Sequence, residues 1–194
     1  MNCGGETCGL LYSGRMDLPK FRIGFAAWVV GACVCLALFA QAVALSAQQQ
    51  TTLQKADSIL VLKKDHVMEL LAGGKVIRTY KVALGRGGLA PKEREGDGRT
   101  PEGHCIIDSR NAASHYHKAL HVSYPNAEDR ARAAKLGVSP GVAIMIHGLP
   151  NGMGWLGAAH RLYDWTLGCI AVTDEEIDEI WNLVPVGTPV EIRP

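Results

Sequence analysis

The stretch VAIMIHG, residues 142–148, followed after a glycine-rich loop by TLGCIAV, residues 166–172, decides the fold of this chain. The first five residues, VAIMI, form a continuous apolar run of the kind found in strands that are buried on both faces. This predicted strand delivers His147 at its carboxyl end, where a rigid backbone can hold the ring. Residues 166–172 predict a second buried strand or turn, which carries Cys169 and leads into a helix.

The segments around this stretch are predominantly short and rich in β-branched residues. The predicted strands cover residues 58–62, 66–71, 75–84, 104–108, 118–124, 142–146 and 188–192, and the first three form an antiparallel meander. Helices are predicted at 126–136 and 174–183, the second with a capping box of Thr173 and Glu176. Glycines and prolines make 85–103 a loop. The fold class is therefore α+β, mainly β, of the β-sandwich type with a few short helices.

The first fifty residues have the pattern of an export signal. Lys20 and Arg22 precede the apolar run Ile23–Ala40, and no charged residue lies between Ile23 and Gln54. The run is close to the roughly 20 residues that a bilayer span needs, so retention as a transmembrane anchor competes with signal cleavage after Ala44. The flanking positive charges orient the segment so that the rest of the chain lies outside the cytoplasmic membrane.

These patterns divide the chain into four parts. Residues 1–22 form a cytoplasmic or signal n-region, 23–47 a signal peptide or transmembrane anchor, 48–57 a polar linker, and 58–194 one folded domain. We expect a protein at the periplasmic or extracytoplasmic face of the inner membrane. It would contact the membrane through its N-terminal segment, unless cleavage of the signal releases it.

Charge and histidine spacing argue against nucleic acid and metal as partners. Residues 51–194 contain 17 Lys and Arg against 17 Asp and Glu, whereas a protein that holds nucleic acid usually gathers a basic excess on one face. His115, His117 and His121 share strand parity, but their spacing supplies neither a fourth ligand nor supporting carboxylates for zinc. The sequence therefore predicts no metal site and no cofactor.

The two cysteines of the predicted domain allow two interpretations. In an oxidising compartment, Cys105 and Cys169 could form a disulfide. Alternatively, Cys169 is a nucleophile, since it follows a glycine and precedes a helix whose first turn presents N–H groups and a positive dipole that favour a thiolate. His147 would then take the thiol proton and later return it to a leaving amine, as in acyl-transfer enzymes.

IHG at 146–148 with TLGCIAV at 166–172 resembles the catalytic domain of the L,D-transpeptidases, the YkuD-type family. That family's pattern is His-Gly, a loop, then Ser or Thr, a variable residue, Gly and Cys. Further similar segments are GDGRTPEG (96–103), HVSYPN (121–126) and HRLYDWT (160–166), so that the resemblance covers roughly 58–192. It implies a cysteine acyltransferase that acts on peptidoglycan stem peptides in cell-wall biogenesis and is acylated by carbapenem-type inhibitors.

The resemblance also implies roles for individual residues. In this family the cysteine attacks the carbonyl before a D-alanine, expels D-alanine and forms a thioester, which an amine resolves. Carried over, Cys169 is the nucleophile and His147 the general base and then acid, oriented by the backbone carbonyl of Gly148. Backbone N–H groups of Gly168 and Cys169 would form the oxyanion hole. The substrate contacts expected are Trp165, Thr166, His160, Arg161 and His121.

Two departures from the family pattern leave the reaction open. Many members have His before the Gly-Cys pair and Arg or Asn two residues after the cysteine, where this chain has Leu167 and Ala171. DWT at 164–166 before the cysteine, together with Ala171 after it, resembles the YafK-like subgroup. In that subgroup, hydrolysis of a stem-peptide or lipoprotein cross-link is implied alongside or instead of transfer. An inactive wall-binding domain is a further alternative. Arg161 could replace the missing cation by binding a stem-peptide carboxylate, or it could pair with Asp164.

Overall fold

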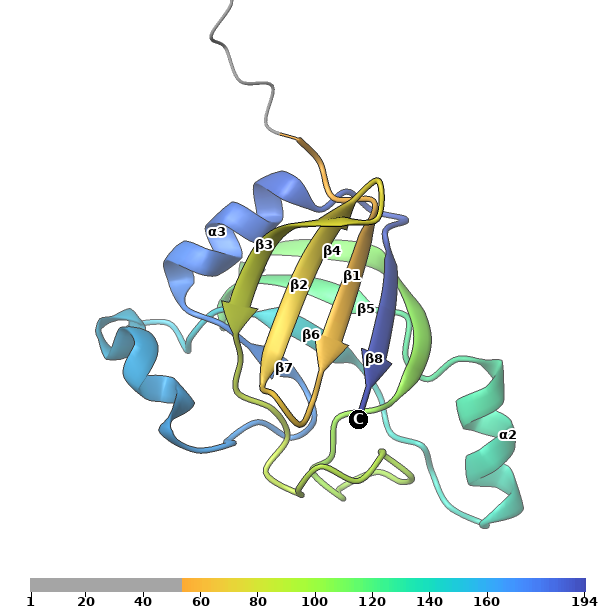
Figure 1. Cartoon of the computed structure of the whole chain (residues 1–194). Coiled ribbons are helices and arrows are strands. Elements are labelled where there is room, and N and C mark those ends of the chain that lie inside the picture. Colours follow the sequence, from red (N-terminus) through yellow and green to blue (C-terminus); the bar gives the residue numbers. More distant parts are fainter. Residues whose placement is uncertain (1–53) are drawn as a thin grey trace, which may run out of the picture. The chain divides into compact units, whose positions relative to one another are not determined.

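The computed structural model describes residues 54–194. The predicted n-region at 1–22, the apolar segment at 23–47 and linker residues 48–53 lie outside the described residues. No helix within residues 54–194 combines the length and the apolar character that crossing a membrane requires. The described part contains an eight-stranded sheet, the α-helices α2 and α3, and the 3-10 segment η1 (Figure 1).

The elements follow one another as predicted over much of the chain. The strands are β1 (Ser58–Leu62), β2 (Val67–Ala72), β3 (Lys75–Lys81), β4 (Gly103–Ser114), β5 (His117–Val122), β6 (Ile144–His147), β7 (Ile170–Ala171) and β8 (Pro189–Arg193). The helical segments are α2 (Ala127–Lys135), η1 (Gly154–Leu162) and α3 (Asp174–Leu183). The strands β1, β2 and β3 form the predicted antiparallel meander.

The sheet is one curled layer with the strand order β3-β2-β1-β8-β4-β5-β6-β7. The long strand β4 causes the curl, because Gly103–Ile106 pairs with β8 and the part from Ile107 onward pairs with β5. Figure 1 shows β1, β2, β3 and β8 lying over β4 to β7. The mainly-β prediction is confirmed, whereas the β-sandwich prediction is corrected: the two facing halves belong to one half-barrel.

The two edges of the curled sheet meet beside the predicted nucleophile. Ala83, just after β3, exchanges backbone hydrogen bonds of 3.0 and 2.9 Å with Ala171 of β7. Two residues later, Gly85 forms a parallel bridge with Thr166. The turn that carries Cys169 is therefore attached to the far edge of the sheet, which fixes its position.

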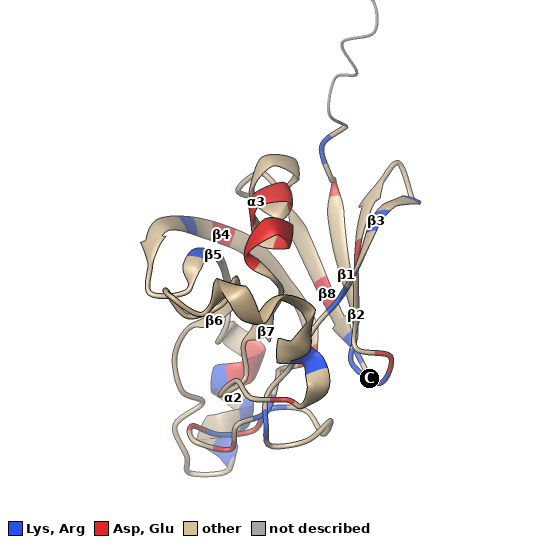
Figure 2. Ribbon diagram, turned by 90° about the vertical axis from the view of Figure 1, so that its left-hand side faces the viewer, with Lys and Arg blue, Asp and Glu red and all other residues tan. Residues whose placement is uncertain are grey.

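Apolar side chains fill the space inside the curl, and α3 closes one side of it. The burial of β1 alternates along the strand, as expected for a strand with one face on the core. In α3, Ile177, Ile180 and Leu183 lie on one face and are buried, and each such side chain contributes ~1.5–3 kcal/mol when removed from water. The opposite face of α3 is acidic (Figure 2). Its capping box, Thr173 with Glu176, forms as predicted.

The strand predicted at 142–146 is shorter than expected. Its first residue, Val142, is 76% exposed and precedes β6, because Gly141 at φ +86° delays entry into the strand. Ile144 and Ile146 are buried as predicted. The stretch 154–162, expected as an irregular loop, instead forms η1, in which Gly157 at φ 46° separates two short helical turns.

Candidate active site

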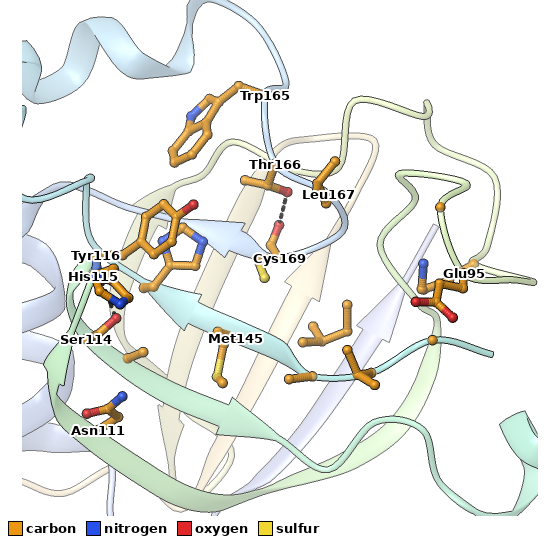
Figure 3. Close-up of a pocket in the computed structure, with 18 residues that line it drawn as sticks. Glu95, Asn111, Ser114, His115, Tyr116, Met145, Trp165, Thr166, Leu167 and Cys169 are labelled. Atoms are coloured by element: carbon orange, nitrogen blue, oxygen red, sulfur yellow. Dashed lines mark hydrogen bonds between the residues drawn. The ribbon is translucent and has the colours of Figure 1, made fainter. Parts of the chain in front are cut away.

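A cavity of about 580 Å³ contains both residues that the sequence predicts as the reacting pair. Its wall includes His147 at the end of β6 and Cys169 immediately before β7 (Figure 3). β6 and β7 are parallel neighbours, with Ile146 opposite Ile170. Because of this register, Cys169 lies level with Met145 on the adjacent strand, close to the strand end that carries the histidine.

The turn before β7 is held by the hydroxyl of Thr166. Thr166 Oγ1 donates to the carbonyl oxygen of Cys169 at 2.8 Å and accepts from the N–H of Gly168 at 3.1 Å. Gly168 has φ +127°, and a Cβ there would lie 2.5 Å from the carbonyl oxygen of Arg99. Only glycine fits this position, because both the backbone conformation and the close approach exclude a side chain.

The imidazole of His147 has a defined tautomer. Its Nδ1 lies 2.7 Å from the backbone oxygen of Gly148, and since a carbonyl can only accept, the neutral ring carries its proton on Nδ1. Nε2 therefore keeps its lone pair for a proton. The ring is 3% exposed and packs against Tyr116 at 4.5 Å and Trp165 at 5.8 Å between ring centroids.

Burial sets the resting protonation of the pair. It lowers the pKa of His147, partly opposed by the hydrogen bond to Gly148. It raises the pKa of Cys169, partly opposed by a backbone hydrogen bond from Met145 and by the charge of Lys92. Both shifts favour the neutral forms at neutral pH, a thiol for Cys169 and an uncharged imidazole for His147. The thiolate expected from the following helix is disfavoured, because burial raises the pKa of Cys169.

The chain is similar to proteins of a known family. The family described as YkuD, L,D-transpeptidase catalytic domain, matches residues 56–192. The chain belongs to this family. YafK of Escherichia coli (strain K12) is 34% identical over 112 residues, which cover 57% of this chain and 38% of YafK. The chain thus spans well under half the length of the curated relatives that it matches.

Two solved structures share the fold of this chain. The helical cell shape determining protein Pgp2 of Campylobacter jejuni matches with a TM-score of 0.54 at 23% identity, covering 77% of this chain and 53% of Pgp2. Bd1075 of Bdellovibrio bacteriovorus matches with a TM-score of 0.50 at 24% identity, covering 73% of this chain and 51% of Bd1075.

Only some of the other residues predicted for the oxyanion hole and for substrate contact line the main cavity. Trp165 and Thr166 line the cavity of this L,D-transpeptidase domain. The N–H of Gly168 already donates to Thr166, so a contribution to an oxyanion hole requires that N–H to serve two acceptors. His160 lies behind Trp165, whose Nε1 donates to its Nδ1 at 3.4 Å, and it lines a separate apolar cavity of about 200 Å³.

The structure does not bring Arg161 or His121 to the wall of the main cavity. Arg161 pairs with Glu176, the capping residue of α3, rather than with Asp164. The Nδ1 of His121 lies 2.5 Å from the Oδ1 of Asp108. Their predicted substrate contacts stay predictions, because the present arrangement gives each side chain another partner.

Two alternatives that the sequence left open concern the cysteines and the histidines. Cys105 and Cys169 are both free thiols, so no disulfide joins them. The three histidines of the HxH pattern have separate surroundings: His115 lines the cavity, His117 pairs with Asp178 at 2.8 Å, and His121 pairs with Asp108. No cluster of metal-ligating side chains occurs within residues 54–194.

The side chains of the cavity that the sequence did not indicate include Tyr116, Lys92 and Glu95. Tyr116 lies between two histidines in the turn from β4 to β5, and its ring packs against His147. The spacing of these histidines suggested only a metal site and indicated no role for the aromatic ring. Lys92 and Glu95 belong to the loop 85–103, which the sequence marked only as irregular. The signal available in the sequence was that these two charged residues lie in a segment that the family resemblance also covers.

Proposed function

We propose that this protein is a cysteine acyltransferase of the extracytoplasmic face, which forms a thioester between Cys169 and a peptidoglycan stem peptide and transfers the acyl group to an amine. The observation that carries the proposal is the shared cavity, in which His147 keeps an unprotonated Nε2 on the wall that also holds Cys169. Family membership supports the same chemistry.

The first half of the proposed reaction moves one proton and exchanges one acyl bond. As Cys169 Sγ attacks the carbonyl carbon before D-alanine, its proton passes to Nε2 of His147. The tetrahedral intermediate collapses, the carbon–nitrogen bond breaks, and Nε2 returns the proton to the leaving amine of D-alanine. Because both groups are neutral at rest, the ion pair exists only while the substrate is reacting.

The second half repeats these steps in reverse. An acceptor amine attacks the thioester carbonyl, gives its proton to Nε2, and releases Cys169 as the thiol. Water can replace the amine, which gives hydrolysis with the same two side chains. Ala171 is fully buried and apolar, so this position supplies no cation for an acceptor's carboxylate. This observation is why hydrolysis is the second candidate function.

Acylation of the thiol tests the enzyme function directly. A carbapenem should raise the intact mass of the protein by one drug molecule, and Cys169→Ala should not react. Cys105→Ala is the matched control, because it removes the other free thiol and should react as the wild type does. Absence of an adduct on reduced, folded protein would leave the inactive wall-binding domain as the better proposal.

Product analysis separates transfer from hydrolysis. Purified tetrapeptide muropeptides should yield cross-linked dimers when an amine acceptor is present. Shortened stems as the sole product, with and without the acceptor, would assign the protein as a hydrolase. His147→Ala should lose either product, because it removes the proposed acceptor of the thiol proton.

We also propose that residues 1–47 export the domain and hold it at the membrane. Lys20, Arg22 and the uncharged run that follows them support this location. Externally added protease should degrade the domain in spheroplasts but not a cytoplasmic marker. Replacing residues 23–40 by a polar sequence should retain the domain in the cytoplasm, whereas a protected domain in the unaltered chain would contradict the proposal.

A further inference from the structure

The active-site cavity has two chemically different ends. One end is formed by neutral side chains, among them Tyr116 and Trp165, and Cys169 lies between this end and Glu95 (Figure 3). Lys92 and Glu95 are the only Lys, Arg, Asp or Glu side chains that line the cavity in the described part of the chain. A substrate that reaches Cys169 therefore meets a localised pair of opposite charges.

Lys92 has an unused hydrogen-bond donor. Its side chain is nearly buried, and its Nζ donates to Oδ1 of Asp97 at 2.8 Å and to the backbone oxygen of Arg94 at 3.1 Å. An ammonium group has three N–H donors, and residues 54–194 provide acceptors for two of them. Asp97 balances the charge of Lys92, but the third donor is free for a ligand in the cavity.

Glu95 offers a free acceptor on the same loop. Its backbone N–H donates to the carbonyl oxygen of Ser139 at 2.7 Å, and its Oε2 accepts from the Ser139 hydroxyl at 2.9 Å. Its other carboxylate oxygen has no donor among residues 54–194. Because Asp97 already neutralises Lys92, Glu95 carries the uncompensated negative charge at this end of the cavity.

The loop that carries both charges is fixed before any substrate arrives. Nζ of the fully buried Lys63 binds the carbonyl oxygens of Ala90 and Thr100 at 3.3 and 3.1 Å and a carboxylate oxygen of Glu102 at 2.8 Å. These contacts hold the loop on both sides of Lys92 and Glu95. A preformed arrangement of charges lowers the cost of binding a matching ligand, since little side-chain freedom is lost.

We propose that Lys92 and Glu95 form a subsite for a zwitterionic α-amino acid group in the side chain of the acyl-donor residue, as in the D-centre of meso-diaminopimelate. The inference rests on the proposed function and deepens it by assigning the diamino acid. The carboxylate of the zwitterion accepts from the free N–H of Lys92, and its ammonium pairs with Glu95. A lone carboxylate would meet the charge of Glu95, and a lone ammonium would leave Lys92 without an acceptor.

The test compares three tetrapeptides that differ only in the donor side chain. One carries the zwitterion, the second has the D-centre carboxylate amidated, and the third has L-lysine in place of the diamino acid. Because a hydrogen bond to a charged group is worth about 1.5–3 kcal/mol, the wild type should use the first with roughly 10–100-fold higher kcat/KM than the other two. Lys92→Met should reduce that ratio to about 3-fold or less.

The second arm of the test uses an exposed residue, so it does not depend on the folding of the Lys92 variant. Glu95→Gln should lower kcat/KM for all three peptides, because each keeps the ammonium. Glu93→Gln is the matched control, since Glu93 is an exposed glutamate of the same loop that does not line the cavity. Melting temperature and iodoacetamide labelling of Cys169 report whether each variant keeps its fold and thiol.

Each outcome decides between the two proposals. Equal use of the three peptides by the wild type overturns the subsite and leaves the acyltransferase function intact. No product and no thioester with any peptide overturns the function itself. A fourth tetrapeptide, with its terminal D-alanine carboxylate amidated, tests the leaving group. If the wild type is sensitive to this amidation and Lys92→Met is not, the charged end binds the leaving group, and the assignment to the diamino acid is wrong.

Discussion

The Nδ1 of His147 lies 2.7 Å from the backbone oxygen of Gly148, and this bond holds the ring proton on the side away from the reaction. A Cβ on Gly148 would lie 2.7 Å from Oδ1 of Asp174, which accepts from the N–H of Leu149 at 2.8 Å. The carbonyl that orients the imidazole is therefore fixed in turn by the first residue of α3. A hydrogen bond to a backbone carbonyl, rather than to a charged side chain, therefore orients His147.

The first prediction concerns the pH dependence of the free thiol. Because burial raises the pKa of Cys169, the rate of alkylation by iodoacetamide should rise only at pH values above the usual pKa of a free thiol. Because burial lowers the pKa of His147, the rate of substrate acylation should fall on the acid side only below about pH 6.5. A stopped-flow pH series measures both limbs. A preformed thiolate–imidazolium pair would contradict this, since it would give an alkylation plateau between about pH 5 and 7.

The candidate pair of His147 and Cys169 could be selected from the sequence because its signal is local. His147 ends an apolar run, and Cys169 lies in a short motif beside the capping box of Thr173 and Glu176. The register of β6 and β7 then brings both residues to one cavity. Family resemblance added the role of the Gly148 carbonyl, whose hydrogen bond to the ring is present.

The rest of the site depends on contacts that are distant in sequence. Asp164 shows this, because its carboxylate accepts from the N–H of Leu84 at 2.7 Å and lies 3.0 Å from the ring of His66. No local pattern connects these residues, so the sequence left open whether Arg161 binds a substrate carboxylate or pairs with Asp164. In the same way, Lys92 reaches the cavity through the long loop 85–103, whose position depends on the distant contacts of Lys63 and is not predicted by periodicity.

The second prediction concerns the hydroxyl of Thr166. Thr166→Val keeps the shape of the side chain but leaves the Gly168 N–H without its acceptor and the Cys169 carbonyl without its donor. We expect a loss of about 1–3 kcal/mol in unfolding free energy. Acylation of Cys169 should slow by roughly 10–100-fold, because the sulfur loses its fixed position. Thr166→Ser is the control and should retain most of both. An unchanged acylation rate in the valine variant would show that the turn does not need these bonds.

The third prediction concerns the buried lysine under the loop. Lys63→Met removes the donor for three oxygens and should lower the unfolding free energy by ~2–4 kcal/mol, mainly because Glu102 and the Thr100 carbonyl lose their partner. Lys64→Met is the matched control, since Lys64 is the exposed neighbour. Urea unfolding measures both variants. Similar midpoints for the two would show that Lys63 does not hold the loop.

The fourth prediction concerns the acid stability that Asp97 provides. Burial acts to raise the pKa of Asp97, but the Lys92 ammonium and three backbone N–H groups outweigh it and lower the pKa to about 2. The carboxyl group in the unfolded chain titrates near 3.9. As pH falls, the unfolded chain therefore binds this proton before the folded protein does. The stabilisation is therefore complete above about pH 4 and is lost as pH falls through about 2.

Asp97→Asn should accordingly cost about 2 kcal/mol of unfolding free energy at pH 7. Its difference from the wild type should shrink steadily between about pH 4 and pH 2. Asp65→Asn, at an exposed turn position, is the control and should follow the wild type throughout. Urea titrations at a series of pH values measure these differences. If the Asp97 variant differs from the wild type by the same amount at every pH, the carboxylate is not what stabilises the loop, and the preformed position of Lys92 must come from Lys63 alone.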